Sequence, residues 1–230
     1  MRILRPLTLA YLAFGAALIA NASRVYWDDD EWAPFMIEKL ELPIPDEDLY
    51  VWVLKVHVVA AIFVLPACLV LMSRVIMRRA PRFHRWLGRV NAAVTLLALV
   101  PSGAYMARFA TGGWPSTLGF LTSGAIVAVA MVMGIRSARA RSLVAHRRWM
   151  LHVFAQMAVA VVSRTMLIAA DAAGFHPIHA YIACLWLPVL GCALFVELLT
   201  GSLPLLRRNR HVPITRRSRP RDLEPGLGRF

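Results

Sequence analysis

The sequence predicts an all-α membrane protein, a polytopic bundle of six transmembrane helices with the N and C termini in the cytoplasm. Three observations lead to this prediction. Apolar residues make up 59% of the chain and charged residues only 17%, whereas a soluble domain has about 25% charged residues. The remaining charges are concentrated between apolar runs long enough to cross a bilayer as helices. Finally, the basic residues fall mainly on one side of the predicted bundle.

The apolar runs divide the chain into four parts. Residues 1–22 form a first span, 23–49 an acidic extracytoplasmic loop, 50–200 a five-helix membrane domain, and 201–230 a basic tail that is predicted to be disordered. Ala20-Asn21-Ala22 also has the form of a signal-peptidase site, but an uncleaved first span is favoured. The predicted spans cover residues 6–22, 50–72, 86–105, 116–135, 149–170 and 180–200.

The charge distribution orients the bundle. This model places 21 of the 26 Lys and Arg residues on the cytoplasmic side, whereas 9 of the 13 acidic residues lie in the first extracytoplasmic loop. A net charge of +13 could indicate nucleic-acid binding. However, the basic residues sit in short clusters between spans, as the positive-inside rule requires. We therefore expect no nucleic-acid partner, and we expect these arginine clusters to contact anionic headgroups of the lipid bilayer.

Polar residues line one face of two predicted spans. His152, Gln156 and Ser163 fall within about 40° of one another around a helix. An earlier span carries a similar stripe of four residues, which are His84, Asn91, Thr95 and Ser102. Each stripe should face other protein or a cavity because polar groups are costly in contact with lipid. Each of these two spans begins near a His-Arg-(Arg)-Trp sequence, which is compatible either with an internal duplication or with two similar basic loops.

These motifs resemble a bacterial family of predicted membrane proteins, domain of unknown function 2306. The matching pieces, within about residues 53–197, are His57, the run His84 to Arg89, Gly112-Gly113 with Gly119-Phe120, and the run Ala145 to Met150 followed by Arg164. The resemblance implies a helical domain in the inner (plasma) membrane of a bacterial cell and brings no established activity. A weaker similarity, carried by His84 and Trp86-Leu87-Gly88, is to di-haem b-type cytochromes.

Histidines at both ends of the spans allow a haem hypothesis. A b-type haem needs two imidazoles facing one another from different helices. His84 and His152 could serve as iron ligands on the inner side, and His57 with His179 or His176 on the outer side. A quinone would instead need hydrogen-bond donors such as His57 and Arg164. The histidines also have structural interpretations: His84 and His146 suit the headgroup interface, His152 a helix–helix hydrogen bond, and His176 and His179 a solvated turn.

Arg164 is harder to explain structurally, because an arginine inside a span costs roughly 2.5–3.5 kcal/mol. Arg164 and His57 both lie about 10 Å below the outer boundary at helical rise. We therefore predict that they lie within about 12 Å of one another and form an outer functional centre.

No catalytic motif occurs in the sequence, so enzymatic activity is left open. Cys68, Cys184 and Cys192 lie in apolar runs and suggest neither a disulfide framework nor a thiolate metal site. The leading hypothesis is binding of a redox cofactor, b-type haem or quinone, for transmembrane electron transfer or oxidase assembly, with a respiratory complex as partner. The alternative is a cofactor-free transporter or an assembly partner of a membrane complex.

Overall fold

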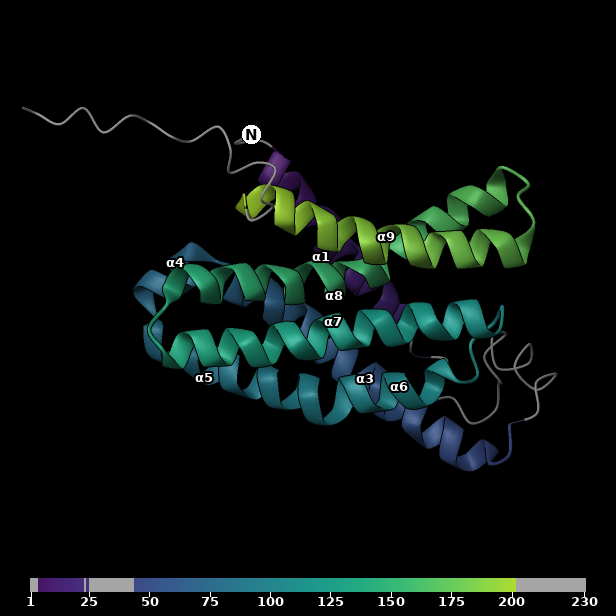
Figure 1. Ribbon diagram of the computed structural model, residues 1–230, viewed down its shortest axis with the longest axis horizontal. Helices are drawn as coiled ribbons and strands as arrows, with labels where there is room; N and C mark the ends of the chain where they lie inside the picture. Colours follow the sequence, from purple (N-terminus) through teal and green to yellow (C-terminus); the bar gives the residue numbers. More distant parts are fainter. Residues whose placement is uncertain (1–3, 23, 25–43, 202–230) are drawn as a thin grey trace, which may run out of the picture.

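The computed structural model describes residues 4–22, 24 and 44–201. This part of the chain is helical and contains no strand (Figure 1). The helices in chain order are α1 (Leu4–Ala22), α3 (Glu47–Leu71), α4 (Arg74–Arg79), α5 (Pro81–Val94), the π-helix η2 (Thr95–Leu99), α6 (Val100–Ala107), α7 (Trp114–Arg139), α8 (Leu143–Ala172) and α9 (Pro177–Thr200). Most of the predicted acidic loop and the basic tail lie outside the described residues.

Five helices of the described chain are long and apolar enough to cross a membrane. They are α3, the continuous run Pro81–Ala107 formed by α5, η2 and α6, and then α7, α8 and α9. The all-helical, multi-span prediction is therefore confirmed. α1 is not among these five helices, so the sixth span and the cytoplasmic placement of both termini stay predictions.

The helices continue beyond the apolar runs into the basic segments. α4 and the start of α5 occupy the basic segment between the predicted spans 50–72 and 86–105. α7 and α8 likewise extend through much of the second basic segment, leaving a turn in which Arg141 has a φ of 57°. Hydropathy marks where lipid begins rather than where a helix ends, and arginine and alanine are good helix formers. The apolar boundaries therefore underestimate the lengths of these helices.

The bundle has two chemically different ends. We call the left end in Figure 1 the arginine-rich end, because α4 and the α7–α8 turn lie there with their arginines. The opposite end, called the far end, holds the start of α3 and the turns before α7 and α9. At the far end, Asp46 caps α3 by accepting a hydrogen bond from the Leu49 amide at 2.9 Å. Gly112 and Gly113 permit the turn before α7, where both have positive φ.

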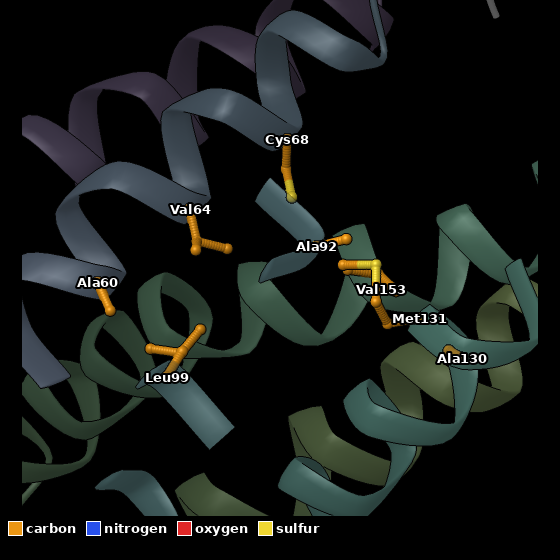
Figure 2. Close-up of a cluster of buried hydrophobic side chains, with 8 residues drawn as sticks. All are labelled: Ala60, Val64, Cys68, Ala92, Leu99, Ala130, Met131 and Val153. Atoms are coloured by element: carbon orange, nitrogen blue, oxygen red, sulfur yellow. The ribbon is translucent and has the colours of Figure 1, made fainter. Parts of the chain in front are cut away.

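α8 is the central helix of the bundle. It packs against α7 on one side and α9 on the other, and it also contacts α3 and α1 (Figure 1). Between α3, α5, α7 and α8 lies a cluster of small and medium apolar side chains (Figure 2). Val64 of α3 and Val153 of α8 are 0% and 2% exposed. The cluster fixes the distance between the helices but has few features that select one helix register over another.

Register in the second half of the bundle is set by a buried amide. Gln156 of α8 is 3% exposed. Its Oε1 accepts a hydrogen bond from the Ser123 hydroxyl of α7, and its Nε2 donates to the Val189 carbonyl of α9, both at 2.9 Å. Both ends of the amide are therefore satisfied only when the three helices are aligned.

The third span is irregular at its centre. η2 replaces a regular α-helical turn just before Pro101, which has no backbone N–H to donate. Two hydroxyls make further hydrogen bonds within the same helix: Thr95 donates to the Asn91 carbonyl at 2.7 Å, and Ser102 donates to the Ala98 carbonyl at 2.6 Å. Part of the polar stripe predicted for this span therefore bonds the backbone of its own helix.

Replacing Gln156 by leucine should lower the stability of the bundle. Both inter-helix hydrogen bonds of the amide would be lost, and such bonds in membranes are worth about 0.6 kcal/mol on average. We expect a loss of about 1 kcal/mol in reversible unfolding in mixed micelles. Ser123→Ala, which removes one bond, should cost less than Gln156→Leu. Equal stability of Gln156→Leu and the wild type would contradict the proposed role of the amide.

The orientation can be tested with cysteines placed in opposite turns. In a variant without the native cysteines, Ser142→Cys lies in the α7–α8 turn and Ala173→Cys lies just after α8, and both positions are exposed. Because the arginine-rich end should face the cytoplasm, a membrane-impermeant maleimide should label Ala173→Cys in intact cells. Ser142→Cys should react only after permeabilisation. The opposite labelling pattern would reverse the predicted orientation.

Candidate functional site

The first candidate site, the far site, is centred on His57 in α3. Its Nδ1 lies 3.0 Å from the hydroxyl of Ser102 in α6. The single hydroxyl hydrogen of Ser102 is directed to backbone carbonyls, at 2.6 Å to Ala98 and 3.1 Å to Leu99. The Ser102 oxygen therefore accepts from Nδ1–H of His57, and the Leu99 carbonyl also interacts with the ring. In this tautomer Nε2 is the acceptor nitrogen of the neutral imidazole.

The imidazole is held on a second side by a glycine. A Cβ atom added to Gly103 would lie 3.1 Å from Cε1 and 3.5 Å from Nδ1 of His57. The backbone of α6 therefore approaches the edge of the ring more closely than a larger residue would allow. Ser102 fixes the rotation of the ring and Gly103 fixes its distance from α6.

Arg164 of α8 belongs to the same region but is not enclosed by it. Its charge acts electrostatically on His57. The side chain is exposed, and its Nη1 donates to the carbonyl of Ala160 in its own helix at 3.0 Å. The guanidinium therefore satisfies part of its hydrogen bonding locally and stays on the surface of the bundle. The far site is accordingly an open site rather than a closed polar pocket.

α1 lies beside the far site. The Tyr11 hydroxyl is 2.6 Å from the Oγ1 of Thr165, the residue after Arg164. Gly15 packs so closely on Val161 that an added Cβ would collide with the valine side chain. These contacts pack α1 against the part of α8 that carries Arg164.

The second candidate site is an ion cluster at the arginine-rich end, called here the triad: Arg148 and His152 of α8 with Glu197 of α9. Nη2 of Arg148 donates to both carboxylate oxygens of Glu197, at 2.8 and 2.7 Å. His152 Nε2 lies 2.8 Å from Oε1 of the same carboxylate. One carboxylate is therefore shared by two basic side chains within the last turns of a membrane-spanning helix.

The triad becomes more buried towards the middle of the bundle. The side chains of Arg148, Glu197 and His152 are 35%, 23% and 8% exposed. Trp149 contributes an aromatic wall: its ring lies 5.5 Å from the Arg148 guanidinium carbon and 5.9 Å from the His152 ring. Nε of Arg148 is buried without a hydrogen-bond partner in the described chain. Nη2 of the guanidinium is therefore hydrogen-bonded, whereas its Nε–H donor has no acceptor among the described residues.

The two histidines that the haem hypothesis paired on the inner side have other described partners. His152 is bound to Glu197, whereas the electrostatic neighbours of His84 are His146 and Arg85. His146 itself bonds the Gly134 carbonyl through Nδ1 at 2.9 Å. Nδ1 of His84 is buried and has no hydrogen-bond partner among the described residues.

The histidines proposed for the outer side also have other described contacts. His176 and His179 are exposed and contact one another, with ring centroids 4.8 Å apart. They belong to the start of α9, which packs against α7 and α8, whereas His57 belongs to α3, which packs against α1, α5, α6 and α8. Among the described residues, no group of three or more His, Cys, Asp or Glu side chains is arranged to hold a metal ion.

The sequence analysis did not identify Gly103 as a site residue, nor Arg148 and Glu197 as partners. A glycine two residues after the Pro101 interruption, and an acidic residue within an apolar run, were the available signals. Neither signal names a partner, because the partners lie 49 and 46 residues away on other helices.

Residues 54–200 match a family model described as Predicted membrane protein (DUF2306). The chain belongs to this family. The resemblance found in the sequence motifs is thus confirmed, and both candidate sites lie within the matched residues. Tyr11 and the rest of α1 lie outside this DUF2306 region. No curated protein and no solved structure gives a significant match. The family defines a multi-pass membrane protein of unknown function.

Removing Glu197 should destabilise the chain more than removing it together with Arg148. Glu197→Leu leaves Arg148 and His152 without their acceptor, for which we expect a cost of about 1–3 kcal/mol. Arg148→Met in the same chain removes the stranded charge and should recover part of that loss. Unfolding of the two single variants and the double variant in mixed micelles gives the coupling energy. Additive effects would show that the pair contributes no coupling.

Proposed function

We propose that the chain binds the head group of a lipid-soluble quinol or quinone at the far site, as part of an electron-transfer or oxidase-assembly system in the membrane. The observation that carries this proposal is the contact between Nδ1 of His57 and the Ser102 hydroxyl, whose hydrogen is directed to backbone carbonyls. With Nδ1–H committed to Ser102, Nε2 is an acceptor suited to a quinol hydroxyl. An imidazole held in this way can accept a hydrogen bond from the quinol hydroxyl in one orientation.

The open geometry supports a ligand that arrives from the lipid. Arg164 is exposed on the surface of the bundle and could donate to a ligand oxygen while retaining its bond to Ala160. Tyr11 of α1 bonds Thr165, the next residue on α8. A water-soluble substrate would gain little affinity from a site whose arginine is exposed on the surface of a membrane-spanning bundle. A ring compound carried in the bilayer can reach the site by lateral diffusion.

A di-haem arrangement fits the described residues poorly. Bis-histidine ligation needs two imidazoles facing one another across an iron atom. Nε2 of His152 is occupied by Glu197, and His84 has His146 rather than His152 as its electrostatic neighbour. His179 contacts His176 and belongs to a helix that packs away from α3. We therefore restrict the redox proposal to quinone chemistry. The cofactor-free alternatives, a transporter or an assembly partner, do not require the oriented acceptor of His57.

Binding can be measured with a short-chain ubiquinol analogue and the full chain in lipid nanodiscs. Saturating ligand should raise the unfolding temperature of the wild type, because it binds only the folded state. His57→Ala should weaken binding by at least about tenfold, equivalent to about 1.4 kcal/mol. Gly103→Val should weaken it as well by displacing the imidazole. The matched control is His179→Ala, at an exposed histidine of the far end, which should bind like the wild type.

A variant of Arg164 tests which oxygen of the ligand the guanidinium binds. Arg164→Leu should lower affinity for the quinol analogue without unfolding the chain, because its only described hydrogen bond is to its own helix. In a second analogue, the oxygen that faces Arg164 is methylated. The affinities of the wild type and Arg164→Leu should differ less for this analogue than for the unmodified quinol. If neither His57→Ala nor Arg164→Leu alters stabilisation by the ligand, the far site is not a quinone site.

A further inference from the structure

We propose that His152 and Glu197 form a proton-binding site that exchanges protons with the aqueous phase at the arginine-rich end. This site is at the opposite end of the bundle from His57, and it does not depend on quinone binding. The two side chains come from different helices, α8 and α9, and meet at 2.8 Å. A carboxylate and an imidazole in contact provide an acceptor for one additional proton within a membrane-spanning segment.

The contact defines where the proton binds. Arg148 has no acceptor to offer and donates to both oxygens of Glu197, so the carboxylate is ionised and accepts from His152 Nε2–H. With a neutral imidazole, the triad has one positive and one negative charge. A further proton from water bonds to Nδ1 of His152 and produces an imidazolium, giving the triad a net charge of +1. Glu197 stabilises that imidazolium through the existing hydrogen bond.

Access to the site is one-sided. The Arg148 and Glu197 side chains are about a third and a quarter exposed (35% and 23%) and lie at the arginine-rich end. Towards the middle of the bundle the next polar residue on the same face of α8 is Gln156, whose amide is bonded on both sides to Ser123 and the Val189 carbonyl. The amide of Gln156 does not titrate. The exposed part of the triad therefore lies at the arginine-rich end.

The other charged and titratable groups around the pair are few. α7, which packs against both α8 and α9, carries Arg136 and Arg139 in its last turn at the same end. α3 contributes Cys68, which is buried against Val153 and accepts a hydrogen bond from Asn91. On α8 itself, His146 bonds Gly134 of α7 one and a half turns before His152. Within the described chain, Glu197 is thus the anion that holds an imidazolium at position 152.

A purely structural ion pair would not need the histidine. Arg148 and Glu197 already neutralise one another and make two hydrogen bonds. Adding an imidazole to this pair introduces a group that changes charge between pH 5 and 8. The group is also the most buried of the three, where a change of charge has the largest effect on its surroundings. These features are expected of a site that takes up and releases a proton.

The fluorescence of Trp149 can be used to measure the protonation of His152. Its ring centroid is 5.9 Å from that of His152, and a protonated imidazole at this distance quenches indole fluorescence. The emission of Trp149 is obtained as the difference between the full-length wild type and Trp149→Phe in nanodiscs. We expect this difference to change with pH between 5 and 9 through a single transition. His152→Gln should remove the transition, and Glu197→Gln should move its midpoint by at least about one pH unit.

Two further variants make the result specific. His179→Gln removes a histidine at the far end and should leave the transition unchanged. His146→Gln removes the other histidine near Trp149 on α8 and should also leave it. A transition that is absent from the wild type, or that disappears with His146 instead of His152, would overturn the proposal. Unfolding temperature reports whether His152→Gln still folds; if it does not, the shift in Glu197→Gln alone decides the outcome.

Discussion

The bundle depends on one constraint: a polar side chain within a membrane-spanning helix needs a hydrogen-bond partner within the protein. Gln156 meets this constraint by bonding Ser123 of α7 and the Val189 carbonyl of α9 at the same time. Apolar side chains such as Val159 and Val189 also pack between α8 and α9, but they make no directional bonds. Once Gln156 is satisfied, the register of three helices is fixed. His152, one turn earlier on α8, then lies opposite Glu197 of α9.

The first half of the membrane domain solves the same problem differently. In the third span, the hydroxyls of Thr95 and Ser102 bond carbonyls of their own helix next to the π-helical turn. Ser102 then has its oxygen available for His57 of α3. A local irregularity of the backbone is thus connected to the orientation of an imidazole on another helix. π-helical turns often accompany functional sites, and here the turn lies directly before the far site.

The two candidate sites differ in the way that charge is held. At the far end, Arg164 stays on the surface and bonds its own helix, so the site remains open to the bilayer. At the arginine-rich end, Arg148 is locked to Glu197, and the triad is progressively buried towards His152. An open site suits a ligand that enters from lipid, and a closed ion cluster suits an ion as small as a proton. α8 carries residues of both sites and connects them as one rigid element.

The sequence by itself determined the all-helical class, the approximate spans of the five long helices, and which polar residues share a face of each span. These properties depend on hydropathy and on the helical period, which are local. It underestimated the helix ends in the basic segments, because hydropathy does not mark them. Only the tertiary structure decided that His152 meets Glu197 rather than His84, and that Ser102 and Gly103 hold His57. A helical period defines the face on which a residue lies, but the neighbour of that face is selected by packing between segments far apart in the chain.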